Sequence, residues 1–236
     1  MFQRKVHPRQ TALFLLAVVI LLTVLHCIAQ AVLVYNGNQA VMVIARSLDL
    51  DIEKNIPSFY SGLALFFSSF LFFCISLLER KKYRYWLGLA AVFLFLALDE
   101  VFILHERLGD YTGKLIKSTE MFEASGLLYF PWIVPYSILM IILGLFYVRF
   151  IFHLPHKTTV LFILSAIIFL TGAAGFDMLG GREAELHGYY SITYSVLYTI
   201  EEFLEMSGVV LLIYALLDYI EQRFGYLHFS LDVQRP

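Results

Sequence analysis

The chain has 236 residues, of which 60% are hydrophobic and 15% are charged, with a net charge of −2. Soluble domains are typically about 45–50% apolar and about 25% charged. The composition therefore excludes a soluble globular enzyme, a disordered chain and a secreted disulfide-rich scaffold, and it offers no basic surface for nucleic acid.

Six stretches are apolar enough, and have the roughly 20 residues needed, to cross a bilayer as helices. They cover residues 11–34, 59–78, 85–104, 127–152, 158–179 and 190–220. We therefore predict an all-α fold, a polytopic membrane helix bundle with six transmembrane helices, in a single domain of residues 1–236. No sheet is expected, because backbone groups in lipid must be satisfied within a helix or a closed barrel.

The first apolar stretch follows a basic segment and so has features of a secretory signal peptide. Its apolar run extends to Tyr35, which is too long for the apolar region of such a peptide. We therefore expect a retained helix. The two cysteines, Cys27 and Cys74, lie within apolar runs near opposite membrane faces, so we expect small core side chains and no disulfide.

Lysine and arginine residues set the expected orientation. The two termini and the even-numbered connections carry 11 of these residues, and the odd-numbered connections carry 6. The positive-inside rule then places both termini in the cytoplasm. The acids are distributed the other way, with 15 of 19 on the outer side, although Asp and Glu contribute little to orientation.

Several outer acids lie inside the apolar runs themselves. The third stretch ends in Asp99, Glu100, His105 and Glu106, the fifth ends near Asp177, and the sixth contains Glu201, Glu202 and Glu205. If the third helix is continuous, Asp99 and Glu106 share one stripe. Ionisable groups at membrane depth usually face a bundle interior or a water-filled cavity, so we expect one site shared by three helices.

A bound metal is the leading explanation for this cluster, because carboxylates with imidazole suit iron, manganese or zinc. We expect five ligands: Glu100, His105, Glu106, Glu202 and Glu205. Three further acids are expected to orient them: Asp99, Asp177 and Glu201. His26 and His187 are additional candidates. The Glu-x-x-His pattern of soluble di-iron bundles is absent here, so the evidence is compositional.

Three alternatives remain open. The acids of the cluster form a cation or proton pathway, or they are simply solvated and paired with Arg107 and Arg182, or the chain is a non-catalytic subunit completed by a membrane partner. If the protein is an enzyme, a redox metal would oxidise a lipid-like or quinone-like substrate. A Lewis-acid metal would instead activate water for hydrolysis.

Three motifs in order resemble an uncharacterised bacterial family of six-helix inner-membrane proteins. The motifs are the outer stretch 48–61, a Leu-Asp-Glu…His-Glu segment at residues 98–106, and a Glu-Glu-x-x-Glu-Met-x-Gly helix at residues 201–208. The resemblance spans most of the chain. It implies six spans in a bacterial inner membrane, and it implies no activity.

Overall fold

The computed structural model describes residues 2–35, 38–119, 125–225 and 228–231. Within them, six helical segments are long and apolar enough to cross a membrane, which agrees with the predicted multi-pass bundle. These segments are built from α1 (Pro8–Tyr35), α3 (Ile56–Leu78), α4 (Tyr83–Phe102), α6 (Ile133–Ile151), α7 (His156–Leu170) with its continuation, and α9 (Ile192–Phe224).

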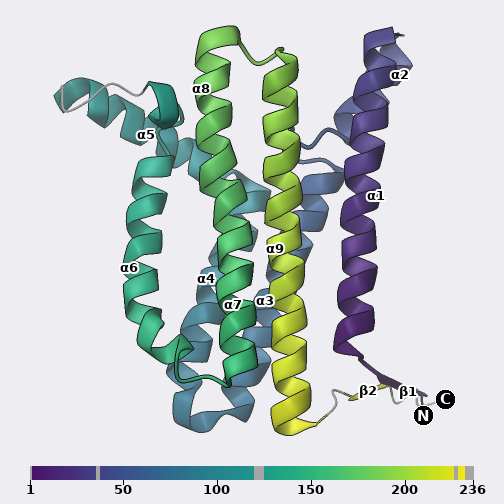
Figure 1. Cartoon of the computed structure of the whole chain (residues 1–236), viewed down its shortest axis with the longest axis vertical. Coiled ribbons are helices and arrows are strands. Elements are labelled where there is room, and N and C mark those ends of the chain that lie inside the picture. The colour runs from purple at the N-terminus through teal and green to yellow at the C-terminus, as the bar shows by residue number, and fades with distance from the viewer. Residues whose placement is uncertain (1, 36–37, 120–124, 226–227, 232–236) are drawn as a thin grey trace, which may run out of the picture.

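The long helices run alternately up and down, so that both ends of the chain lie at the same end of the bundle (Figure 1). We call this end the terminal end, and the opposite one, where α8 meets the start of α9, the far end. The long helix α9 is the most enclosed of the six, and it packs against α1, α3, α7 and α8. The main core forms around α9, with Trp86 and Phe72 among its largest fully buried side chains.

Shorter elements occupy both ends of the bundle. At the far end lie α2 (Gln39–Ser47), α5 (Leu104–Thr119) and the single turn η2 (Gly126–Leu128). The turn η1 (Arg80–Lys82) joins α3 to α4. At the terminal end, β1 (Phe2–Lys5) pairs antiparallel with β2 (His228–Leu231). The expectation of no sheet is therefore wrong for the ends of the chain, where backbone groups are outside the apolar spans.

The predicted third span, residues 85–104, does not continue as one helix through its acids. The helix α4 ends at Phe102, and Ile103 adopts a left-handed conformation with φ of 54° before α5 begins. Asp99 is buried whereas Glu106 is exposed, so these two residues do not form the predicted stripe.

The fourth and fifth spans also differ from their predicted bounds. The span predicted at residues 127–152 becomes helical only at Ile133. The fifth helix passes through a π-helical segment, η3 (Thr171–Phe176), and continues as α8 (Asp177–His187) to Gly188. Consecutive glycines at residues 180 and 181 therefore do not end this helix. A Cβ on Gly181 would lie 3.0 Å from Cδ2 of Phe130, so this glycine allows the close approach of Phe130.

Candidate functional site

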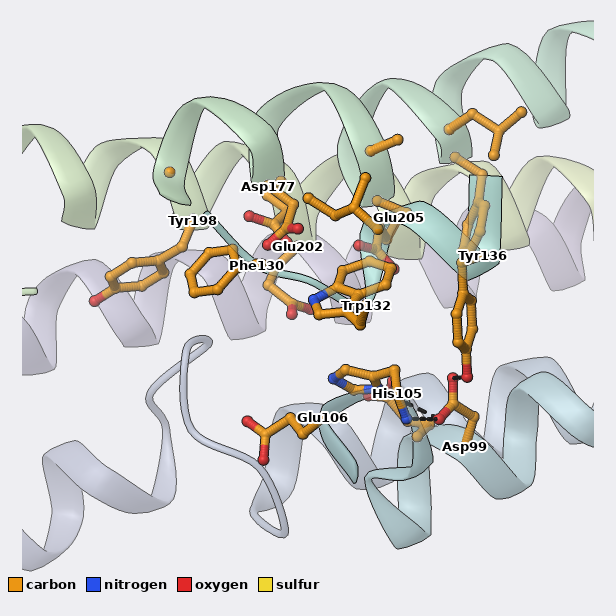
Figure 2. Close-up of a pocket in the computed structure, with 18 of the residues that line it drawn as sticks. Asp99, His105, Glu106, Phe130, Trp132, Tyr136, Asp177, Tyr198, Glu202 and Glu205 are labelled. Atoms are coloured by element: carbon orange, nitrogen blue, oxygen red, sulfur yellow. Dashed lines mark hydrogen bonds and ion pairs between the residues drawn. The ribbon is translucent and has the colours of Figure 1, made fainter. Parts of the chain in front are cut away.

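The acids that the sequence places on three helices surround one cavity in the half of the bundle toward the far end (Figure 2). The cavity has a volume of about 510 Å³. Its ionisable lining, apart from tyrosines, consists of Asp51, Glu53, Asp99, Glu100, His105, Glu106, Asp177, Glu201, Glu202 and Glu205. No lysine or arginine lines it among the described residues. A concave surface with charges of one sign concentrates ions of the opposite sign, so this cavity attracts cations.

Asp99 holds the turn between α4 and α5 against α6. Its Oδ1 accepts a hydrogen bond from the backbone N of His105 at 2.7 Å and lies 3.3 Å from His105 Nδ1. Its Oδ2 accepts a hydrogen bond from the Tyr136 hydroxyl at 2.7 Å, and Figure 2 shows these contacts. The turn requires the left-handed Ile103. Such a conformation is strained for a β-branched residue, and strain of this kind gathers at functional sites.

His105 is oriented by these contacts. With Nδ1 beside Asp99, its Nε2 lies 4.0 Å from Glu53 Oε1, and its ring centroid is 5.3 Å from that of Trp132. Burial lowers the pKa of His105, but the hydrogen bond to Asp99 and the charges of Asp99, Glu53 and Glu106 together raise that pKa above its usual value. A carboxylate that fixes one imidazole nitrogen while the other remains available is the usual support of a metal-ligating histidine.

The π-helical segment η3 brings Asp177 to the cavity. A Cβ on Gly172 would lie 2.6 Å from the backbone O of Glu201 and 2.9 Å from Cγ of Glu205, so only glycine permits this approach to α9. Asp177 follows directly, is 8% exposed, and has a buried Oδ2 with no hydrogen-bond partner. Single π-helical turns are frequent at functional sites.

The helix α9 supplies three acids within two turns. Glu201 and Glu205 are one turn apart, and Glu202 lies between them in sequence. The carboxyl groups of Glu202 and Glu205 are within electrostatic range of those of Glu100 and Glu53. The loop after α2, α4 and α9 therefore contribute to a single carboxylate cluster.

Aromatic side chains complete the walls. Tyr194 donates a hydrogen bond from its hydroxyl to Asp51 Oδ1 at 2.7 Å, as Tyr136 does to Asp99. Tyr189, Tyr198, Phe130 and Trp132 also line the cavity. Asp51 and Asp99 thus each have one oxygen fixed by a tyrosine hydroxyl. The aromatic rings of the lining reduce contact of the remaining acids with bulk water.

His26 positions the acidic loop after α2 and does not line the cavity. Its buried ring accepts a hydrogen bond at Nδ1 from the backbone N of Leu50 at 3.3 Å. Its Nε2 lies 3.2 Å from the Thr199 hydroxyl, and Asp49 lies 3.5 Å from Nδ1. Both ring nitrogens therefore have partners, which tie the loop to α1 and α9.

His187 also lies outside the cavity lining. It is largely exposed and pairs with Glu183 at 3.1 Å, one turn earlier on α8. The other eight candidates all line the cavity: Asp99, Glu100, His105, Glu106, Asp177, Glu201, Glu202 and Glu205. Their division into ligands and orienting groups stays a prediction.

Sequence reasoning missed Asp51 and Glu53 as site residues. Both lie in the loop after α2 rather than in an apolar run, and the predicted site contains only acids in or directly after such runs. The available signal was the acidic stretch at residues 49–53, which belongs to the excess of acids predicted for the outer side. Glu53 is half-buried. Burial raises its pKa above the usual value, the charge of His105 lowers it, and the charges of Glu106 and Asp99 raise it further.

Among the described residues, no group of three or more His, Cys, Asp or Glu side chains is arranged ready to hold a metal ion. The donor types do fit one, since carboxylates and a single imidazole suit manganese, iron or zinc. Two carboxylate oxygens, Glu53 Oε2 and Asp177 Oδ2, are buried without a partner. Leaving a buried acceptor unsatisfied is costly, and a bound cation can satisfy such an oxygen.

Comparison with known proteins identifies the family of the chain. No curated protein and no solved structure matches it significantly. One family model matches residues 11–219, a range that contains the whole of the cavity lining. The chain therefore belongs to the family described as a domain of unknown function, DUF8692.

Proposed function

We propose that this protein is a membrane metalloprotein that binds a divalent or redox-active metal ion in its acid-lined cavity. The observation that carries the proposal is the convergence of nine carboxylic acids and one imidazole on a cavity whose described lining has no lysine or arginine. Carboxylates this close cannot all be ionised without a compensating charge, because like charges and burial both disfavour ionisation. A bound cation supplies that charge.

The ligands that we assign are Glu100, His105, Glu106, Glu202 and Glu205. Asp99 orients His105, and its own second oxygen is held by Tyr136. Asp177 and Glu201 orient the ligands on α9. We add Glu53 to the ligand set, because its Oε1 lies 4.0 Å from His105 Nε2 and its Oε2 is unpartnered.

The chemistry that such a metal supplies is either Lewis-acid activation of water or electron transfer. The described residues contribute the environment for it. Aromatic rings around the acids limit access of bulk water, and the fixed Asp99 holds the imidazole of His105 in one orientation. A lipid-like or quinone-like substrate reaching the cavity from the outer leaflet fits the apolar part of its lining, including Leu96 and Met140.

We further propose that the terminal end faces the cytoplasm of a bacterial cell and that the cavity opens to the outer side of the inner membrane. The distribution of lysine and arginine supports this orientation. β1 and β2 lie near opposite ends of the chain and pair with each other. Both ends are therefore on the same side of the bundle, which is consistent with an even number of spans.

Metal content of the detergent-purified full chain tests the proposal. We expect one or two iron, manganese or zinc ions per chain by inductively coupled plasma mass spectrometry after purification without chelators. Glu202→Gln should remove this metal, because it replaces a charged carboxylate ligand with a neutral amide. The matched control is Glu221→Gln, the same change on the same helix near the terminal end.

Absence of metal from the wild-type protein would overturn the proposal, as would equal metal in the wild type and in Glu202→Gln. Equal loss in both variants would indicate a general defect, and size-exclusion chromatography of each variant separates that case. A third variant, His105→Gln, tests the imidazole independently of α9.

A conducting pathway through the same acids is less well supported. The cavity lining includes the apolar residues Leu65, Phe169 and Leu170. At the terminal end, Asp218 is paired with Lys157 at 2.6 Å, and Glu79 accepts hydrogen bonds from Trp86 and Tyr219. These acids are thus engaged locally, and the described residues offer no chain of acids joining them to the cavity.

A further inference from the structure

A second hollow adjoins the acid-lined cavity on the side of α2. Its volume is about 830 Å³, and it is formed by α2, the loop after it, the start of α3 and the end of α4. We call it the α2 groove. Its lining consists of Val43, Arg46, Ser47, Ile52, Glu53, Lys54, Asn55, Ile56, Ser58, Phe59, Glu100 and Val101.

The α2 groove lies at the level of a lipid headgroup. Ile56 is the first residue of the spanning helix α3, and Val101 is next to the last residue of α4, so the groove is at the ends of two spans. Its apolar side chains are open to the surroundings, with Phe59 64% exposed and Val43 61% exposed. Apolar surface beside polar groups at this depth suits a molecule with acyl chains and a charged head.

The α2 groove carries charges of both signs. Arg46 and Lys54 are exposed and have no ion pair within the part of the chain that the structure describes. Glu53 and Glu100 supply the carboxylates. Lys54 also holds a left-handed conformation with φ of 62°. A strained backbone at a lysine that lines a groove is unusual. Such strain persists only where the surrounding structure fixes the conformation.

We propose that the α2 groove binds a phospholipid whose head carries both a phosphate and a primary ammonium group, the phosphatidylethanolamine class. The phosphate pairs with Arg46 and Lys54, which suit anionic oxygens. The ammonium donates hydrogen bonds to Glu53 and Glu100. A lipid with a glycerol head lacks the cation for these carboxylates, and a quaternary choline head lacks N–H donors.

The α2 groove and the acid-lined cavity share Glu53 and Glu100. A lipid amine held by these carboxylates therefore lies at the wall of the proposed metal site. The lipid assignment stands on the groove alone, whereas the further inference that this lipid is presented to a metal rests on the proposed function.

Native mass spectrometry of the detergent-purified full chain tests the lipid proposal. Phosphatidylethanolamine, phosphatidylglycerol and phosphatidylcholine with identical acyl chains are added in equal amounts to the delipidated protein. We expect one retained lipid, with phosphatidylethanolamine exceeding each of the others about tenfold. The double variant Arg46→Gln/Lys54→Gln should retain much less phosphatidylethanolamine than the wild-type protein, because the partners of its phosphate are removed.

The matched control is Arg107→Gln/Arg182→Gln, which removes two other cations that do not line the groove and should retain as much phosphatidylethanolamine as the wild-type protein. Equal retention of the three lipids, or preference for phosphatidylglycerol, by the wild-type protein would overturn the proposal. Unchanged retention of phosphatidylethanolamine by Arg46→Gln/Lys54→Gln would do the same. Metal content distinguishes this inference from the proposed function, since Arg46→Gln/Lys54→Gln should keep the metal and His105→Gln should keep the lipid.

Discussion

At the scale of single residues, Asp99 holds two neighbouring side chains of the site in place. Both of its oxygens are engaged, one by His105 and one by Tyr136. The acid therefore fixes the direction of an imidazole rather than offering itself to a ligand. A residue that positions a ligand in this way depends in turn on the groups that hold that residue in place.

Replacing the phenol that holds Asp99 tests this dependence. We expect Tyr136→Phe to weaken Mn²⁺ affinity about 10-fold, because loss of a supporting hydrogen bond frees the carboxylate that orients His105. Isothermal titration calorimetry of the metal-depleted protein measures the change. Tyr190→Phe, at a fully exposed tyrosine outside the cavity lining, is the control. An affinity of Tyr136→Phe equal to that of the control would contradict the role of Asp99.

A second prediction concerns the strained Ile103. We expect Ile103→Gly to stabilise the protein by about 1 kcal/mol, because an L-residue in the left-handed region costs roughly 1–2 kcal/mol and glycine avoids this cost. The midpoint of unfolding in sodium dodecyl sulfate measures the effect. Leu98→Gly, in the interior of α4, should instead destabilise by about 1 kcal/mol. A loss of stability in both variants would show that the conformation of Ile103 carries no relievable strain.

At the scale of elements, the contact between η3 and α9 decides where the acids of two helices meet. We expect Gly172→Ala to destabilise the protein by about 1–3 kcal/mol, because the added Cβ would overlap the Glu201 backbone and force the helices apart. It should also lower metal content. Gly175→Ala is the matched control in the same segment, since its Cβ would meet nothing closer than 3.9 Å. Thermal unfolding and metal analysis of both variants measure the difference, and equal behaviour would contradict the prediction.

The same elements show what can be predicted from sequence. Apolar runs of about 20 residues specify the spanning helices, because lipid permits few other backbone structures. The acids within those runs indicate the part of the bundle that holds the cavity. The break at Ile103 could not be predicted, because an isoleucine in the left-handed region has no local sequence signal. The loop acids Asp51 and Glu53 were missed because tertiary contacts of His26, rather than local pattern, bring their loop to the cavity.

At the scale of the whole molecule, charge asymmetry predicts how the bundle is oriented. We expect alkaline phosphatase fused after Gly188, at the far end, to be active in a bacterial host, because that enzyme folds only outside the cytoplasm. A fusion after Gly225, beyond α9, should be inactive. Green fluorescent protein at these two positions is the reciprocal control, with fluorescence expected only after Gly225. The opposite pattern would invert the orientation and place the cavity toward the cytoplasm.

The central position of α9 has a consequence for biosynthesis. The ribosome delivers the spans in order, so the helix that fills the core is the last of the six to reach the membrane. Until it arrives, the carboxylates of α4 lack the wall that completes their cavity, and charged groups exposed in lipid are costly. A nascent chain with five inserted spans therefore has an incomplete acidic site, and insertion of the sixth span completes it.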